Sequence, residues 1–589
     1  MYFNKIIDTP NVPGKIVFFP RGKTTYVYFQ VSREYIPEKK FNTPKRVLIG
    51  KLVDPNDRSK MYPNRNYREH FPDGGDFTPK PLPAPVKRSN TLKVGTFIAL
   101  ELLIKDLQIN QGLVMCCPEY SGFILDYANY MIIDECNVAQ HYPTYARCHP
   151  LFTKGMHIYS DSAVSWIFNH IERDVSESFL DWWNARMDHN QRIYVSYDST
   201  NKNWQAGDVC LAEFGHAKDD KGVPIVGVAL AFDQTNQVPL LVEIYPGSLN
   251  DVRQLKYLID KLETYKYKSI AIIIDRGYFS RENIEYMDSK GYHFLMMVKG
   301  CKPLVSQLVD EKHGTFESDR ECHVSGTELY GVTVQRELYE GDTKKRWFHL
   351  YFSPEKMLSE RRQLENKLNA ISAVLAKMEG TEYDMPEAYD EYFECHYRTD
   401  GDKRIFMFAV EKKEAITAAL NRCGYFCLIS SEKISAEDAY HIYSGRDSTE
   451  KLFRADKTFL GSDSMRVHTD LAFRNKIFVE FNALVIRNRI FNLLKTSMKR
   501  LNIRNNYMTV PAAIRELEKI EMTRHNGGKY QLDYALTRNQ KQILQSLGIS
   551  EAEFLARAEQ LALELQEVED ELEFDDGEDQ EMMDYEQAS

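Results

Sequence analysis

The sequence has little of what marks membrane, secreted or zinc-binding proteins. No apolar run approaches the roughly 20 residues of a membrane-spanning helix. The opening residues, MYFNKIIDTP, lack the basic and then apolar order of a secretory signal. The 10 cysteines are scattered without C-x-x-C spacing, which indicates neither a zinc site nor a disulfide framework. We therefore expect a protein of the reducing cytoplasm that has no membrane partner.

Positive charge is in the minority over the whole chain, with 75 Lys and Arg against 86 Asp and Glu, but the two signs are unevenly distributed. The net charge is −11, yet residues 1–93 hold 18 Lys and Arg against 8 Asp and Glu. From Glu559 to Ser589 there are 14 acidic residues and no basic ones. The basic front predicts binding to nucleic acid. The acidic tail is either solvated disorder or a mimic of nucleic acid that regulates the basic parts.

Length and patterning predict several domains around an α/β core. The 589 residues allow three or four domains, and 43% hydrophobic with 27% charged residues is typical of globular proteins. The proline-rich stretch Thr78–Asn90 is expected to be a linker. The predicted order is a β-rich basic DNA-binding region (1–93), a helical domain (94–188), the first part of the core (189–300), an inserted β-rich and helical domain (301–435), the second part of the core (436–500), a helical C-terminal region (501–558) and an acidic disordered tail (559–589).

The pattern within 189–300 predicts a mixed sheet with helices on its faces. Strands are expected at 192–198, 208–218, 224–233 and 238–247, followed by a helix at 250–265, a strand that ends at Asp275, a helix at 281–291 and a strand at 292–300. In open α/β sheets the carboxyl ends of the strands form the ligand crevice. We therefore expect a site near Asp198 and Asp275, where two of these strands end, although each aspartate alone could simply begin a turn.

A third carboxylate, Glu450, lies on a predicted helix that could pack across that edge. Three carboxylates suit hard divalent cations, which take oxygen ligands. Two such ions roughly 3.5–4 Å apart can promote phosphodiester cleavage. The pattern thus favours metal-dependent chemistry on a phosphodiester.

The stretch YSGRDSTEKLFRADK places unusual chemistry around this glutamate. Gaps of three, four and seven residues put four side chains on one face of an α-helix, namely Tyr443, Arg446, Glu450 and Lys457. A face of this kind does not suit a hydrophobic core. Arg446 and Lys457 either hold phosphates of a bound strand or only balance the charge of Glu450.

These motifs resemble those of the DDE transposases of bacterial insertion sequences. The four-residue spacing matches the YREK motif of one group, and DSTN at Asp198 and DRGY at Asp275 are similar to its two aspartate motifs. The stretch from GHAKDDKG to NDVRQL between them, and SMRVHTD after Glu450, are also similar. The resemblance is strong over about 190–300 and 435–490 and weak elsewhere.

The resemblance implies an RNase H-like core in which Asp198, Asp275 and Glu450 bind two Mg²⁺ (or Mn²⁺) ions. It implies cut-and-paste transposition, in which terminal inverted repeats are bound, each transposon end is cut by hydrolysis, and the freed 3′-hydroxyl attacks target DNA. A DNA hairpin intermediate is a further option, because relatives with such an insertion use one. The partners would be DNA and other copies of the chain, as a homodimer or larger, in the bacterial cytoplasm with the nucleoid.

Several residues are expected to contact DNA. The resemblance places Tyr443, Arg446 and Lys457 close to the transposon end. Trp347 would stack on a flipped base, worth roughly 1–3 kcal/mol, or is a buried strand residue. Region 1–93 is expected to recognise the terminal repeats. The other candidates are Arg276, which follows Asp275; Arg466 and His468, which follow the Glu450 helix; and His216 and Lys218, which face either DNA or solvent.

Two other classes of protein share these features. One is a transposase-derived DNA-binding protein without catalysis, against which the intact set of three carboxylates argues. The other is an RNase H-like metal-dependent nuclease or resolvase that performs no strand transfer. Terminal inverted repeats flanking the gene would separate these alternatives.

Overall fold

The computed structural model describes residues 6–21, 24–36, 41–55, 57–71, 88–204, 209–215, 222–249, 251–298, 302–461, 464–502, 508–524 and 529–574. The chain forms two compact units. Unit 1 consists of Met1–Val175 and Leu471–Ser589, and unit 2 is the continuous segment Ser176–Asp470. Within the described ranges, no helix is long and apolar enough to cross a membrane. Most of the predicted linker Thr78–Asn90 lies outside the described residues.

The N-terminal part of unit 1 forms an antiparallel sheet with the strand order β1-β5-β4-β3-β2. Val27, Ile49 and Met61 pack in its core with Tyr67 of α1. Because side chains alternate between the faces of a strand, the residues between the buried positions of β3 lie on the opposite face. The elements are β1 (Ile7–Asp8), β2 (Ile16–Arg21), β3 (Thr24–Ile36), β4 (Phe41–Asp54), β5 (Asp57–Pro63) and α1 (Arg65–His70).

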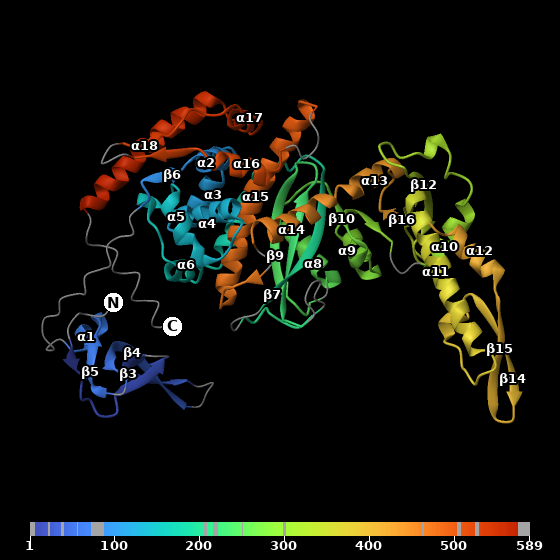
Figure 1. The fold of residues 1–589 in the computed structure, drawn as a ribbon, viewed down its shortest axis with the longest axis horizontal. Coiled ribbons are helices and arrows are strands. Elements are labelled where there is room, and N and C mark those ends of the chain that lie inside the picture. Colours follow the sequence, from blue (N-terminus) through green and yellow to red (C-terminus); the bar gives the residue numbers. More distant parts are fainter. Residues whose placement is uncertain are drawn as a thin grey trace. The chain divides into compact units, whose positions relative to one another are not determined.

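The rest of unit 1 is mainly helical (Figure 1). Its two chain segments are joined by a small sheet, in which β6 (Thr91–Lys93) pairs with β18 (Glu521–Thr523) and β18 pairs with β19 (Gln531–Leu532). The helices are α2 (Gly95–Leu107), α3 (Ile109–Cys116), α4 (Ser121–Asp134), α5 (Tyr142–Cys148), α6 (Asp161–Phe168), α15 (Asp470–Arg500), α16 (Val510–Leu517), α17 (Arg538–Ser546) and α18 (Glu551–Phe574).

Helix α18 corrects the prediction that the chain is disordered from Glu559 onward. The helix continues to Phe574, and residues 575–589 lie outside the described residues. Phe554, Ala558, Leu561 and Leu565 are buried along one stripe of α18, at the spacing of an amphipathic helix. The acidic residues therefore occupy the remaining faces of a helix whose apolar stripe holds it in place.

The core of unit 2 is a large mixed sheet with the order β12-β13-β16-β11-β10-β7-β8-β9 (Figure 1). β10 lies parallel to both β7 and β11, and the other neighbours in this order are antiparallel. The predicted α/β class is thus confirmed. The strands are β7 (Ile193–Trp204), β8 (Ile225–Asp233), β9 (Val238–Pro246), β10 (Ile270–Ile274), β11 (His293–Met297), β12 (Tyr330–Glu337), β13 (Lys345–Phe352) and β16 (Tyr425–Ser430), with β17 (Ser464–Met465) beside β7.

Every residue of β8 and of β10 is buried, as expected for strands that are covered on both faces. The strand predicted at 208–218 is wrong, because its described residues form only an isolated bridge between Glu213 and Ile225; His216 and Lys218 lie outside the described residues. The helices of unit 2 are α7 (Val175–Ala185), α8 (Asp251–Thr264), α9 (Arg281–Ser289), α10 (Lys302–Lys312), α11 (Pro354–Met378), α12 (Lys413–Asn421), α13 (Ala436–Ser444) and α14 (Asp447–Phe459).

The stretch predicted as an inserted domain, 301–435, contributes to two separate structures. β12, β13 and β16 belong to the main sheet, so the predicted boundaries do not separate two sheets. The long helix α11 packs instead on the hairpin of β14 (Phe393–Asp400) and β15 (Lys403–Glu411). Leu368 and Leu375 of α11 form a core there with Phe406.

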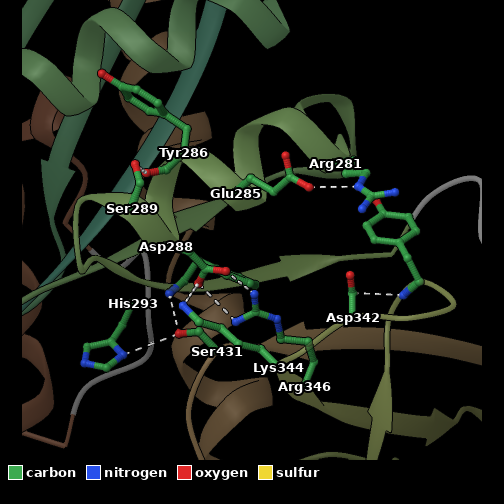
Figure 2. Close-up of polar contacts among 12 residues, drawn as sticks. Arg281, Glu285, Tyr286, Asp288, Ser289, His293, Asp342, Lys344, Arg346 and Ser431 are labelled. Carbon is green, nitrogen blue, oxygen red and sulfur yellow. Dashed lines mark hydrogen bonds and ion pairs between the residues drawn. The ribbon is translucent and has the colours of Figure 1, made fainter.

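Figure 2 shows how β13 is tied to α9. Asp288 of α9 forms ion pairs with Lys344, at 3.5 Å, and with Arg346. The guanidinium of Arg346 is buried and also lies over the ring of Phe294, 5.3 Å from its centre. Arg346 therefore holds elements of unit 2 together.

His349 links three neighbouring strands of the main sheet. Its Nδ1 lies 2.9 Å from Thr333 Oγ1 on β12, and its Nε2 lies 2.9 Å from Ser430 Oγ on β16. The ring is fully buried, and this burial lowers the pKa of His349 to about 4. The imidazole is consequently neutral in the folded protein at neutral pH.

We expect this histidine to make unit 2 less stable in mild acid. Because its folded-state pKa is depressed, the unfolded chain takes up the proton first, so stability is complete above about pH 6.5 and is lost as the pH falls toward 4. The loss from this one group is about 2 kcal/mol at about pH 5. Urea unfolding of the wild type and of His349→Gln, each at about pH 7 and at about pH 5, measures this loss of stability. The control is His441→Gln, which changes an exposed histidine and should keep the wild-type pH dependence. If the unfolding free energy of His349→Gln fell with pH as steeply as that of the wild type, His349 would not be the cause of the loss.

Candidate active site

Asp198 and Asp275 lie side by side at the end of a parallel strand pair. The pairing of β10 with β7 ends where Ile274 faces Tyr197, so each aspartate directly follows the last paired residue. The prediction that the first strand stops at Asp198 is wrong, because β7 continues to Trp204. The antiparallel pairing of β7 with β8 continues past Asp198, which is itself paired with Leu230.

The predicted single helix from Tyr443 to Lys457 is two helices. α13 ends at Ser444 and α14 begins at Asp447, with Gly445 and Arg446 between them. Tyr443 thus comes from the last turn of α13, whereas Glu450 is in the first turn of α14. At the break, the backbone N–H of Arg446 donates to the carbonyl of Tyr443 over 3.1 Å, which is a tighter turn than that of an α-helix.

Arg446 connects the first aspartate to the glutamate. Its Nη2 lies 2.7 Å from Glu450 Oε1 and its Nη1 lies 3.9 Å from Asp198 Oδ2. The side chains of Arg446 and Asp198 are 16% and 17% exposed, against 43% for Glu450. Burial by itself would lower the pKa of Arg446, but Tyr443 and the three carboxylates around it raise that pKa above its ordinary value. The guanidinium is the charge that these carboxylates share.

Tyr443 reaches the second aspartate. Its hydroxyl donates to Asp275 Oδ1 over 3.3 Å, and the guanidinium of Arg446 lies 5.5 Å from the centre of its ring. Burial raises the pKa of Tyr443 well above the usual range, and the neighbouring Asp275 raises it further. The phenol therefore keeps its proton and remains a donor to the carboxylate.

A buried ion pair fixes α14 on β7. Lys202 Nζ lies 2.7 Å from Asp456 Oδ2, and the two side chains are 1% and 4% exposed. Asp456 belongs to the buried stripe of α14 together with Thr449, Leu452 and Phe453. Glu450 is adjacent to that stripe, so the pair helps to set its position relative to the strand that carries Asp198.

Comparison with known proteins identifies the family. The family model of the transposase DDE domain matches residues 177–486, more than half of the chain. The chain belongs to the DDE transposases. No curated protein matches it. A solved structure that resembles this transposase is the piggyBac transposase synaptic complex with hairpin DNA, with 10% identity and a TM-score of 0.31 over 73% of this chain and 66% of that one, slightly under two thirds of that chain's length.

The donor set of the transposase fits hard divalent cations, because carboxylate oxygens are their preferred ligands. Among the described residues, no three His, Cys, Asp or Glu side chains are gathered as the ligands of one ion. The positive guanidinium of Arg446 stands between Asp198 and Glu450. The positive charge between these two carboxylates is thus supplied by a side chain of the protein.

The other residues predicted to contact DNA are distributed more widely. Arg276 is exposed directly after Asp275, and Lys457 is half-buried on α14. Arg466 and His468 are exposed but follow β17, which pairs with the end of β7 at Trp204, on the order of 20 Å along the strand from Asp198. The structure does not bring these last two to the carboxylates.

Trp347 is also remote from the carboxylates. It lies on β13, which three strands separate from β7, roughly 19 Å across the sheet. Its ring is partly buried and has Lys433 Nζ 5.7 Å from its centre.

Sequence reasoning missed the residues that support the site. Asp456 carried a detectable signal, since an acidic residue in the inward stripe of an amphipathic helix needs a buried partner. Lys202 and Gln234 had none, because each acts on residues more than 200 positions away in the chain.

Proposed function

We propose that this transposase moves a bacterial insertion sequence by a cut-and-paste mechanism on an RNase H-like core. Three antiparallel strands, β7, β8 and β9, followed by the parallel strands β10 and β11, support that core. The chain would bind the terminal inverted repeats, cut the DNA at each end by hydrolysis and join the 3′-hydroxyl to target DNA.

The observation that carries the proposal is the convergence of three carboxylates on one guanidinium. Asp198 and Asp275 lie directly after the last residue pair of the parallel strands β7 and β10, and Glu450 comes from the helix that packs beside β7. Arg446 pairs with the first aspartate and the glutamate, and Tyr443 donates to the second aspartate. An ion pair between Arg446 and Glu450 alone would not need two further aspartates beside it.

Asp198, Asp275 and Glu450 would hold two Mg²⁺ or Mn²⁺ ions. Bound divalent ions activate a water molecule and stabilise the leaving oxygen of a phosphodiester. The role of Arg446 would be to neutralise the carboxylates without DNA and to turn to a phosphate of the bound strand, for which a guanidinium suits bidentate contact. Tyr443 would hold Asp275 in orientation.

DNA binding would also involve the N-terminal sheet of unit 1, which consists of β1 to β5. Arg58 lies over the ring of Phe18 at 5.0 Å, and Arg46 lies over that of Phe19 at 5.4 Å. Cations beside aromatic rings suit contacts to both phosphates and bases. We propose that this region recognises the terminal repeats, that the working complex is a dimer or larger, and that it acts at the nucleoid in the cytoplasm.

The decisive test is cleavage of a labelled duplex that carries the presumed element end and its flanking DNA. We expect the wild type to cut at the end boundary only when Mg²⁺ is present, and Glu450→Gln to lose at least about 10³-fold in rate. Asp447→Asn is the matched control, because Asp447 is exposed in the same helix turn and pairs with Lys451; it should cut normally.

Other outcomes of this assay would point elsewhere. Specific binding of the end without any cut would favour the catalytically silent DNA-binding protein. Cuts spread along the duplex would favour a plain nuclease. If Glu450→Gln cut the duplex as fast as the wild type, Glu450 would not be a catalytic residue.

A further inference from the structure

Gln234 lies between the strand of Asp198 and the helices that carry Tyr443 and Glu450. It directly follows β8, and its backbone N–H donates to the carbonyl of Tyr194 on β7 over 2.8 Å. Its side-chain amide contacts the hydroxyl of Ser196. Ser196 is fully buried on β7, two residues before Asp198. The position of Gln234 is therefore set by the strand of the first aspartate.

The same amide occupies the break between α13 and α14. When it is oriented so that its polar atoms meet partners of opposite polarity, Nε2 donates to the carbonyl of Ile442 at 3.0 Å and Oε1 accepts from the N–H of Arg446 at 3.1 Å. In a continuous α-helix, that carbonyl and that N–H would bond to each other. A side chain inserted into the helical ladder is a known cause of helix breaks. Gln234 bonds to both groups of this pair. Each group also makes a tighter backbone bond, from Gly445 N–H to the carbonyl of Ile442 at 3.2 Å and from Arg446 N–H to the carbonyl of Tyr443 at 3.1 Å.

Gly445 provides the space for this insertion. A Cβ atom at position 445 would lie 2.8 Å from Gln234 Cδ and would collide with the amide. The φ and ψ of Gly445 are −60° and −21°, which any residue adopts, so the glycine is needed for room rather than for backbone freedom. Gln234 and Gly445 are thus a matched pair.

We propose that Gln234 is a positioning residue for the cleavage reaction. By holding the helix break against β7, it directs the guanidinium of Arg446 toward Asp198 and Glu450. Without the amide, Ile442 and Arg446 could complete the helical bond, and the start of α14 would turn relative to the strand. This inference rests on the proposed function, because it concerns the same three carboxylates.

The test is a double-mutant cycle on DNA cleavage with Mg²⁺. Gln234→Ala and Gly445→Ala are each expected to lower kcat by roughly 10–100-fold, the usual effect of losing a residue that orients a metal site, with KM for the DNA end within about twofold. The double variant should be no slower than Gln234→Ala alone, because the added methyl no longer meets an amide. Gln307→Ala, at a glutamine bonded to Glu311 on α10, is the control and should match the wild type.

Each outcome is decisive. A wild-type kcat in Gln234→Ala, or a loss confined to thermal stability with normal kcat per folded molecule, would overturn the positioning role while leaving the proposed function intact. Additive losses in the double variant would overturn the link between Gln234 and Gly445. If Gln234→Ala does not fold, Gly445→Ala displaces the same amide and answers the question. A wild type that cuts no end under any divalent ion would overturn both proposals.

Discussion

Replacing Asp198 or Asp275 by asparagine is expected to lower the rate of DNA cleavage by at least about 10³-fold. Asparagine keeps the shape of the side chain but removes the negative charge and one anionic oxygen. The two aspartates directly follow the last paired residues of the parallel strands β7 and β10, and they share Arg446 as a nearby cation. Since groups that act as one site are not additive, the double variant should be within about tenfold of either single variant.

The measurement is single-turnover cleavage of the end duplex, with binding followed separately by a mobility shift. Binding should persist, because Arg446 loses an internal partner and remains available to the DNA. Asp310→Asn is the control, because Asp310 is half exposed and pairs with Arg422 on another part of unit 2. If cleavage by either aspartate variant stayed within tenfold of the wild type, that residue would not belong to the catalytic set.

Lys202→Met is expected to destabilise unit 2 by about 3–5 kcal/mol, which is typical of removing one partner from a buried ion pair. The change leaves the Asp456 carboxylate in a site where it is only 4% exposed. Adding Asp456→Leu should restore most of the stability, because an apolar pair of similar volume has no charge to desolvate. Denaturant unfolding of the single and double variants measures both effects.

The same helix offers a matched control for this prediction. Lys451 and Asp447 of α14 form an ion pair of 3.2 Å in which both side chains are more than half exposed. Lys451→Met should therefore change the free energy of unfolding by less than about 0.5 kcal/mol. Equal losses in Lys202→Met and Lys451→Met would show that burial of the first pair contributes nothing.

Local patterns were sufficient for much of unit 2. The run of apolar residues in β10 predicted a buried strand that ends at Asp275, and the structure has that strand at Ile270–Ile274. The amphipathic spacing around Glu450 predicted a helix, and α14 is present with its buried stripe. Such signals are readable because helix and strand periodicity depend only on near neighbours in the chain.

The failures share a different cause. Asp198 does not end its strand, because the ladder with β8 continues beyond it. The helix from Tyr443 is divided at Gly445 and Arg446, where the amide of Gln234 meets the carbonyl of Ile442 and the N–H of Arg446. The acidic residues after Glu559 are helical as far as Phe574, because an apolar stripe of α18 is buried. In each case the deciding partner belongs to another element.

The sequence by itself determined which side chains this transposase brings to its candidate site and on which kinds of element they lie. It did so because the spacing of three carboxylates and their basic and aromatic companions is a property of the chain. Only the tertiary structure decided how those elements meet: that Arg446 stands among the carboxylates, that a Lys202–Asp456 pair holds the helix on the strand, and that the amide of Gln234 lies where α13 gives way to α14. These contacts join residues far apart in sequence, and their energies arise only when folding removes the groups from water.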